Sequence, residues 1–340
     1  MEHRRREPAP GIFRLILPLP FPGLHRVNAF VIAGDDDVTL VDCGLHDPAL
    51  PGDGAWAELV AALEANGFGP SDVRRLIVTH THIDHYGMAG RFVNETSCEL
   101  WMHEAAHDEL SVYRDPDGAR RRVAEMLADH GVDTDDIEEL TAFEDWSAFV
   151  YAVVEPTTSL RGGETFSYGP RRWNVVHTPG HARSHICLHE PEEGILISGD
   201  HLLPSITPHI DFRREADADP LGEFLSSLQV VEKLDPRLVL PGHGRPFEGG
   251  GERARVVARH HDRRLGSILQ VIRHEPHTAS EISDAIFGTG LLDFHRRLAL
   301  GEALAHLAYL RERGEVERVV DDDGRYRYRK AVRSRGASDE

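Results

Sequence analysis

The feature that most limits what this chain can fold into is a run of potential metal ligands directly after a compact apolar segment. Residues 74–80 read RRLIVTH, which is typical of a buried strand, and the run that begins there contains His80, His82, Asp84 and His85. In an extended strand end alternate side chains point the same way, so His80 and His82 can bind one ion. The chain then turns, and Asp84 with His85 can face a second ion. Imidazole and carboxylate ligands suit Zn, Fe or Mn.

Three further fragments have the same arrangement of a β-like run that ends in a polar loop. The fragment WNVVHTPGH supplies His181, ILISGD supplies Asp200, and LVLPGHG supplies His243. A rigid sheet can aim groups from the ends of its strands, so these side chains are predicted to meet the first run. Three residues that follow close behind potential ligands could contact a substrate or simply pack: Tyr86, His201 and His209.

The order of strand and helix patterns predicts two β-plus-α halves followed by a smaller domain. With 340 residues, of which 40% are hydrophobic, the chain can form one sizeable core and an appended domain. Strand patterns cover residues 12–44, 74–80, 98–102, 151–155 and 171–200, and the segment from about 103 to 150 reads as a helical insertion. We predict an α+β domain over 11–248, a linker and helix over 249–264, and a winged-helix-like domain over 265–330. The last domain is expected as helix, helix and hairpin.

Charge and cysteine content limit the partners. The formal net charge of −19 repels polyanions, and the arginines of the C-terminal region are interleaved with acidic residues, so nucleic acid is a disfavoured partner that stays open. The three cysteines lie in or beside apolar strand-like runs, which favours reduced thiols and a cytoplasmic location. No apolar segment approaches the roughly 20 residues that span a bilayer, so no membrane partner is expected. A homodimer is a further possibility.

Taken together, four motifs resemble those of the metallo-β-lactamase superfamily: H-x-H-x-D-H at 80–85, TPGH at 178–181, SGD at 198–200 and PGHG at 241–244. VDCG at 41–44 matches the first motif of that superfamily, and the resemblance covers roughly residues 12–246. It implies an αββα sandwich. It also implies one metal on His80, His82 and His181, a second on Asp84, His85 and His243, a bridging Asp200, and a structural role for Asp42 behind the ligands. The C-terminal region is similar to that of an endoribonuclease-like subgroup whose relatives include acyl-carrier-protein thioesterases.

The resemblance implies a binuclear metal-dependent hydrolase, with two divalent ions of which Zn is favoured and Fe or Mn are alternatives. We expect a metal-bridging hydroxide to attack the carbonyl of an ester, thioester or lactone in a small acyl substrate. Asp84 is the predicted catalytic residue, which orients water or transfers a proton. Three alternatives stay open: an RNA phosphodiesterase, a mono-iron dioxygenase, and a non-enzymatic nucleic-acid-binding protein that uses the C-terminal domain.

Overall fold

The computed structural model describes residues 6–21, 23–47, 49–50, 53–142, 145–212 and 219–331. The chain forms two compact units, which are described separately. The sheet unit comprises residues 1–118, 145–208 and 223–257, and the helical unit comprises residues 119–144, 209–222 and 258–340. In the described part of the chain, no helix is both long enough and apolar enough to cross a membrane.

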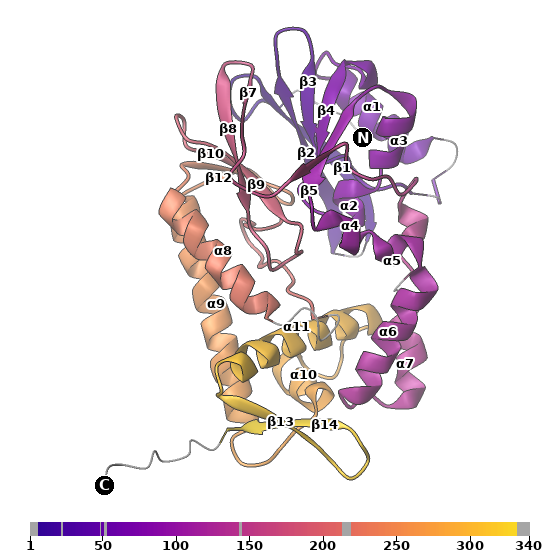
Figure 1. Cartoon of the computed structure of the whole chain (residues 1–340), viewed down its shortest axis with the longest axis vertical. Helices are drawn as coiled ribbons and strands as arrows, with labels where there is room; N and C mark the ends of the chain where they lie inside the picture. The colour runs from indigo at the N-terminus through magenta and orange to yellow at the C-terminus, as the bar shows by residue number, and fades with distance from the viewer. Residues whose placement is uncertain are drawn as a thin grey trace. The chain divides into compact units, whose positions relative to one another are not determined.

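Two six-stranded sheets form the centre of the sheet unit (Figure 1). The first sheet has the order β1-β2-β3-β4-β5-β6, and the second has the order β12-β11-β10-β9-β8-β7. The strands of the first sheet are β1 (Ile12–Phe21), β2 (Leu24–Ala33), β3 (Val38–Val41), β4 (Val73–Ile77), β5 (Glu99–His103) and β6 (Thr158–Leu160). The strands of the second are β7 (Thr165–Tyr168), β8 (Arg171–His177), β9 (Ile186–Glu190), β10 (Ile195–Gly199), β11 (Leu238–Pro241) and β12 (Phe247–Glu248).

Within the sheet unit, helices lie outside both sheets, with α1 and α3 on one side and α8 with residues 250–257 of α9 on the other (Figure 1). The helices that precede β6 are α1 (Gly54–Glu64), η1 (Pro70–Asp72), α2 (Ile83–Tyr86), α3 (Ala89–Glu95), α4 (Ala106–Glu109), α5 (Ser111–Arg114), α6 (Pro116–Asp129), α7 (Thr134–Thr141) and η2 (Ser147–Phe149). Those that follow β10 are α8 (Pro220–Leu234), α9 (Gly250–Val271), α10 (Ala279–Phe287) and α11 (Asp293–Glu312).

Buried apolar side chains explain why the two sheets pack face to face. Phe30 and Ile77 from the first sheet meet Trp173 and Ile197 from the second in one cluster of buried residues. A second cluster covers the other face of the first sheet, where α1 buries one of its faces through Trp56, Leu59, Ala62 and Leu63. The layers therefore run helix, sheet, sheet, helix, and the predicted αββα fold is confirmed.

The strand pattern read from the sequence was wrong in places. Residues 151–155 were predicted as a strand, but the structure has none there. Instead the backbone of Val154 bonds to the buried Tyr86 side chain: the Val154 N–H donates to the Tyr86 hydroxyl at 2.7 Å, and that hydroxyl donates to the Val154 carbonyl at 2.9 Å. The Tyr86 side chain thus takes backbone hydrogen bonds that a neighbouring strand would otherwise make. The short strands β6, β7 and β12 were missed.

The glycine-rich residues 249–251, at the start of the predicted linker, are mostly helical. The helix begins within them, at Gly250. A Cβ at Gly250 would lie 2.5 Å from Cγ of Pro236, and one at Gly251 would lie 2.4 Å from Oδ1 of Asp235. These glycines therefore allow close packing against the preceding loop, which the sequence alone does not reveal.

The helical unit contains α7, α10, α11 and the hairpin of β13 (Val316–Val320) and β14 (Tyr326–Lys330). Thr278 and Glu281 form a reciprocal capping box at the start of α10. The hydroxyl of the buried Tyr328 is 2.8 Å from Nδ1 of His130. The helical insertion predicted over residues 103–150 is thus divided between the two units. The helix, helix and hairpin follow in the predicted order, and the winged-helix interpretation of residues 265–330 stays a prediction.

Candidate metal centre

The seven predicted ligands follow the ends of four strands in the sheet unit. Four of them follow β4, two in the loop and two in the short helix α2, and β8, β10 and β11 are each followed by one. Strands β10 and β11 are parallel neighbours in which Gly199 pairs with Pro241, so Asp200 and His243 emerge at the same edge. The Ile186 N–H donates to the Thr79 carbonyl at 2.9 Å, which ties β9 to the loop after β4. This bond between the two sheets brings the ligand loops together.

The first group of ligand atoms comes from His80, His82 and His181. One nitrogen of each imidazole lies within 4.8 Å of the other two. Nε2 of His80 is 3.1 Å from Nδ1 of His82, and the rings of His82 and His181 have centroids 4.5 Å apart. Three nitrogens directed at one point are a typical ligand set for a transition metal.

The second group consists of Asp84, His85 and His243. Oδ2 of Asp84 lies 3.1 Å from Nε2 of His243 and 3.6 Å from Nε2 of His85. Asp200 lies between the two groups. Its Oδ2 is 3.8 Å from Nε2 of His181 and 3.3 Å from Nε2 of His243, while its Oδ1 is 3.4 Å from Nε2 of His85. The structure therefore brings all seven predicted residues together, with Asp200 within reach of both groups.

The loop after β11 approaches the ligands closely only because residue 242 is glycine. A Cβ at Gly242 would lie 2.3 Å from Oδ1 of Asp200 and 2.7 Å from Cε1 of His85. Both neighbours are buried and held from behind, so neither can move aside cheaply. The PGHG sequence thus encodes a close approach as well as a ligand.

Asp42 orients one histidine from each group. Its Oδ2 accepts hydrogen bonds from Nδ1 of His85 at 2.8 Å and from the Thr79 hydroxyl at 3.0 Å, while its Oδ1 accepts from the Thr79 N–H at 2.8 Å. The Thr79 oxygen in turn lies 3.0 Å from Nδ1 of His80. Protons on both Nδ1 atoms leave both Nε2 atoms with lone pairs that face the ligand cluster, as expected for metal-binding histidines. Asp42 has a φ of 61°, a strained value that its contacts maintain.

Two further ligands are held from behind in the same way. Nδ1 of His243 donates to the Arg26 carbonyl at 2.8 Å, which directs its Nε2 at Asp84 and Asp200. The backbone N–H of Asp200 donates to Nε2 of His185 at 3.1 Å, and Nδ1 of His185 lies 2.8 Å from the Thr178 hydroxyl. Ligand geometry is therefore fixed by partners that lie on, or close to the ends of, several different strands.

Charge differs between the two groups. Burial, followed by the neighbouring imidazoles of His85, His82 and His181, holds the pKa of His80 well below its usual value. Burial also opposes protonation of His243, but Asp200 and Asp84 outweigh it and raise the pKa of His243 to about 10. Burial would raise the pKa of Asp84, but His85 and His243 lower it to about 2. The second group thus concentrates negative charge that attracts protons or a cation.

These donor sets fit a pair of divalent cations. The ligands are nitrogen and carboxylate oxygen, and none of the described cysteines joins them. Within the described residues, Nε2 of His85 and Oδ1 of Asp200 are buried atoms that have no hydrogen-bond partner. A buried polar atom without a hydrogen-bond partner destabilises the fold. Coordination of a cation would give both atoms a partner.

Glu109 on α4 is a supporting residue that the sequence did not predict. Its Oε2 accepts a hydrogen bond from the Thr81 hydroxyl at 2.9 Å and another from the Ser184 hydroxyl. Its Oε1 accepts from the Arg183 N–H at 2.6 Å. One carboxylate therefore ties the loop of His80 and His82 to the loop of His181. No motif marks Glu109, because its role depends on contacts far apart in sequence.

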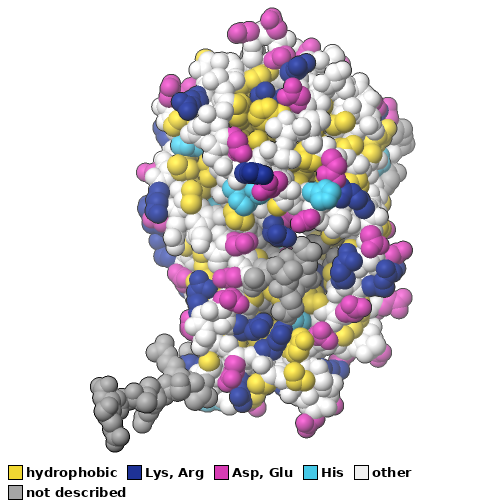
Figure 2. Space-filling model, viewed as in Figure 1, with side chains coloured by type: hydrophobic (Ala, Val, Ile, Leu, Met, Phe, Trp, Pro, Cys, Tyr) yellow, Lys and Arg dark blue, Asp and Glu magenta, His cyan; other side chains and the backbone are white. Residues whose placement is uncertain are grey.

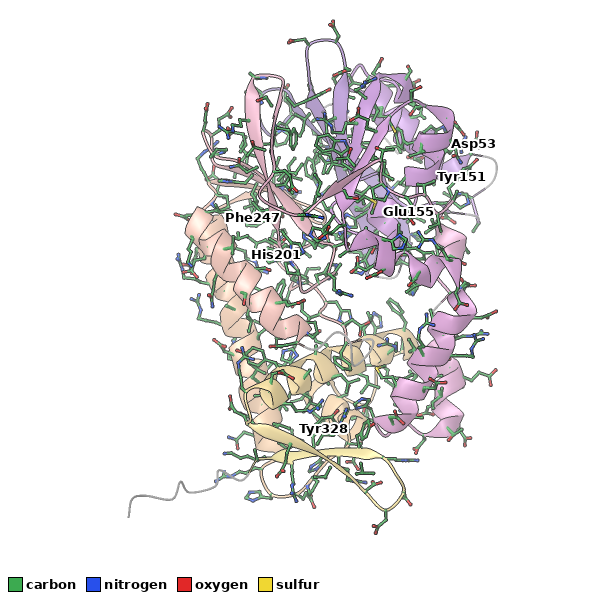
Figure 3. The ribbon with its side chains drawn as sticks, viewed as in Figure 1. Asp53, Tyr151, Glu155, His201, Phe247 and Tyr328 are labelled. Atoms are coloured by element: carbon green, nitrogen blue, oxygen red, sulfur yellow. The ribbon has the colours of Figure 1, made fainter. Side chains whose placement is uncertain are left out.

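We expect Glu109→Ala to lower kcat/KM about tenfold and to weaken retention of metal by the three-histidine group, because supporting partners of ligands have effects of this size. Glu109→Gln should retain most activity, since both hydroxyls can rotate to accept from an amide. Kinetics and metal content after dialysis measure both effects. Glu155→Ala, at an exposed carboxylate labelled in Figure 3, is the matched control. Equal activity and metal retention in Glu109→Ala and Glu155→Ala would contradict this role.

The other residues that follow the ligands have mainly structural surroundings. The Tyr86 side chain is buried, with its hydroxyl bonded to Val154 as described above. His201, labelled in Figure 3, is also fully buried, and its ring packs against Phe224 with centroids 5.1 Å apart. His209 belongs to the helical unit and contributes to a different cluster.

That cluster contains a second set of ligand-type atoms, from His261, Glu302 and His306. Glu302 is already paired with Arg264, and one of its oxygens lies 3.5 Å from Nδ1 of His209. Nδ1 of His306 donates to the Glu302 carbonyl at 2.7 Å, so Nε2 of His306 can accept from Nδ1 of His261 at 3.1 Å. The Glu302 carboxylate thus has cationic partners within the protein. We interpret this cluster as an ion-pair network that holds α9 against α11.

The network predicts a loss of stability at alkaline pH. Burial opposes protonation of His209, but Asp211 and Glu302 outweigh it and raise its pKa to about 9. A folded-state pKa above the ordinary 6.5 stabilises the fold fully below pH 6.5, and this stabilisation is lost as pH rises through 9. Allowing for partial exposure, we expect wild-type protein to lose about 2 kcal/mol over this range. The free energy of unfolding, measured with urea at several pH values, should depend less on pH in His209→Gln than in wild-type protein. In His274→Gln, a change at an exposed histidine, it should depend on pH as in wild-type protein. An unchanged curve for His209→Gln would contradict the assignment.

Comparison with family models matches residues 22–243 to the model described as the metallo-beta-lactamase superfamily. Residues 265–331 match the model described as the metallo-beta-lactamase-like, C-terminal domain. Both matches follow the order of the chain, and the first contains all seven of the clustered residues.

Individual relatives extend this similarity. The probable metallo-hydrolase YqjP of Bacillus subtilis is 27% identical over 310 residues, which are 88% of this chain and 92% of that protein. The human protein named acyl-coenzyme A thioesterase MBLAC2 is 28% identical over 232 residues, which are 67% of this chain and 76% of that protein. A solved beta-lactamase domain protein from Burkholderia ambifaria has 34% identity and a TM-score of 0.83, covering 96% of this chain and 94% of that chain.

Proposed function

This chain belongs to the metallo-beta-lactamase superfamily, and from that premise we propose that it is a binuclear metal-dependent hydrolase of acyl thioesters. The observation that carries the proposal is the convergence of seven nitrogen and oxygen ligands around two adjacent points, with a carboxylate between them. Zn is the metal we favour, because imidazole and carboxylate ligands without thiolates suit it.

Each group of side chains has a distinct role in the proposed reaction. His80, His82 and His181 would hold one ion, Asp84, His85 and His243 a second, and Asp200 would contribute to both. Bound there, divalent ions would supply Lewis-acid chemistry, which activates water near neutral pH and polarises the oxygen of an acyl group. The protein fixes these ligands through Asp42, Thr79, Glu109 and the Arg26 carbonyl, so little reorganisation is needed during turnover.

Asp84 is the residue proposed to handle the proton. Its pKa of about 2 keeps it ionised at neutral pH, and Oδ2 is directed at His243. Oδ1 is then the atom that can orient the attacking water and accept its proton. Water adds to the carbonyl carbon and the carbon–sulfur bond breaks; the proton held by Asp84 passes to the leaving thiolate, and the second water proton is released to solvent as the acyl group becomes a carboxylate.

A thioester is favoured over other acyl substrates by the relatives. The human protein named acyl-coenzyme A thioesterase MBLAC2 is 28% identical to this chain over 67% of its length. An ester or lactone needs the same chemistry, with oxygen in place of sulfur as the leaving atom, and these substrates therefore belong in the same test.

Charge pairing in the helical unit weighs against RNA cleavage. Arginines of this region form ion pairs with carboxylates: Arg296 with Asp136, Arg297 with Asp211, Arg313 with Asp219, Arg325 with Asp133, Arg327 with Asp321, and Arg329 with Glu317. Figure 2 shows Lys and Arg interspersed with Asp and Glu over the visible face. Tight binding of a polyanion instead relies on cations that are available to phosphates.

The test is a substrate screen of purified protein with measured metal content. The panel contains acyl thioesters, lactones, aryl esters, phosphodiesters and single-stranded RNA, and oxygen consumption is followed with thiol substrates. We expect metal-dependent release of thiol from thioesters at the highest kcat/KM. Preferential cleavage of RNA, or oxygen uptake by protein that contains one iron, would replace the proposal by one of those activities.

A further inference from the structure

Four arginines lie on segments that border the metal centre, namely β1 and the residues before it, β2, and the loop after β11. Arg14 lies in β1 and Arg26 in β2, Arg245 follows the PGHG motif, and Arg6 precedes β1. The Arg14 N–H donates to the Arg6 carbonyl at 2.8 Å, which places the N-terminal segment next to β1. Arg6, Arg26 and Arg245 are exposed, and Arg14 is partly buried.

Arg14 anchors this cluster to the loop that carries His243. Its Nη2 donates to the Gly244 carbonyl at 2.6 Å, and its Nε donates to Oδ1 of Asn28 at 2.9 Å. Asn28 in turn donates to the carbonyls of Pro241 at 2.7 Å and Gly244 at 2.9 Å. The backbone of Arg26 is bonded to Nδ1 of His243, whose Nε2 faces Asp84 and Asp200. The His243 ring therefore lies between the backbone of Arg26 and the ligands Asp84 and Asp200.

The charges of the cluster are not neutralised by other described residues. The chain carries 57 acidic residues against 38 basic ones, so carboxylates to pair with arginine are plentiful. Nevertheless no described carboxylate forms an ion pair with any of these four arginines, whereas Arg91, Arg114, Arg161 and Arg171 of the same unit are paired. Burial, together with the charges of Arg6, Arg245 and Arg26, lowers the pKa of Arg14 to about 10. Such a concentration of positive charge is stabilised by an anion.

We propose that Arg6, Arg14, Arg26 and Arg245 bind the phosphates of coenzyme A, so that the thioester substrate is an acyl-coenzyme A. This inference rests on the proposed thioesterase function and identifies its leaving group. In coenzyme A the pantetheine arm separates the sulfur from the diphosphate and the ribose 3′-phosphate. When the carbonyl lies at the metals, the phosphates must therefore bind away from them, at the rim. Guanidinium groups bind phosphates through paired, charge-assisted hydrogen bonds.

The first test measures binding of adenosine 3′,5′-bisphosphate, the nucleotide end of coenzyme A, to the full-length metal-loaded protein by calorimetry. Wild-type protein should bind it, and added salt should weaken binding. Arg26→Gln/Arg245→Gln should weaken binding at least about tenfold, because two charge-assisted contacts to phosphate are lost. Arg14 is left in place because it holds the loop. Arg74→Gln/Arg172→Gln removes the same charge from two exposed arginines on β4 and β8 and should bind as wild type does.

The second test compares KM for an acyl-coenzyme A with KM for the same acyl group on pantetheine, which lacks the phosphates. Wild-type protein should favour the coenzyme A thioester, and Arg26→Gln/Arg245→Gln should lose most of that preference. If both thioesters are hydrolysed equally well by wild-type protein, the arginine assignment is overturned and the thioesterase proposal stands. If the bisphosphate binds at these arginines but neither thioester is cleaved, the thioesterase proposal fails and the leaving-group assignment fails with it.

Discussion

Replacement of Asp200 by alanine is expected to lower kcat/KM for thioester hydrolysis by at least about a thousandfold, because the loss of several kcal/mol of charge stabilisation has this effect on rate. The carboxylate lies between the two ligand groups, within 3.8 Å of His181, 3.3 Å of His243 and 3.4 Å of His85. In Asp200→Ala, both groups of ligands lose the carboxylate oxygens that lie between them. Steady-state kinetics and metal analysis of the same preparation measure the effect.

The control for Asp200→Ala must separate loss of the centre from loss of the fold. Circular dichroism and the urea midpoint should show that the variant remains folded, because the two sheets are held by an apolar core that Asp200 does not join. Asp262→Asn, at an exposed position on α9, should keep wild-type activity. A folded, metal-replete Asp200→Ala protein with full activity would show that Asp200 is not part of the reacting centre.

Asp42→Asn is expected to have the next largest effect, a 10- to 100-fold loss of metal affinity or activity at about constant fold stability, as is usual for partners that orient ligands. Asparagine tolerates the positive φ of this position as well as aspartate does, so the substitution tests the hydrogen bonds rather than the backbone. All three bonds to the Asp42 carboxylate come from donors on Thr79 and His85. The amide nitrogen of asparagine cannot accept these hydrogen bonds. We therefore expect the orientation of His80 and His85 to be disturbed.

Competition with a chromophoric chelator measures the affinity of the metals in Asp42→Asn. Asp53→Asn makes the same chemical change at an exposed carboxylate, labelled in Figure 3, that pairs with Arg91, and it should behave as wild type does. If Asp42→Asn and Asp53→Asn retain metal equally, the carboxylate of Asp42 does not orient the ligands.

The sequence predicted the parts of this protein that depend on local pattern. Buried runs of apolar residues before His80, Asp200 and His243 identified β4, β10 and β11, and the αββα order followed from resemblance of the motifs. The ligand residues were identifiable because polar side chains at the ends of buried strands have few structural explanations. The parallel pairing of β10 and β11 then brings two of them to one edge.

Features that depend on distant contacts could not be predicted. Residues 151–155 have the composition of a strand, yet the Tyr86 hydroxyl takes the hydrogen bonds that a strand neighbour would make. Glu109 lies in a helical segment of ordinary composition, and only the fold shows that it joins two ligand loops. The arginine cluster combines residues that lie more than 200 positions apart, so its charge is invisible in the sequence.

The most direct test of the central claim is the metal content of wild-type protein, measured by elemental mass spectrometry after reconstitution with Zn and dialysis. The account predicts two ions per chain, which a strong chelator removes together with thioesterase activity and which added Zn restores. Protein that is folded and active with fewer than one ion per chain would contradict it.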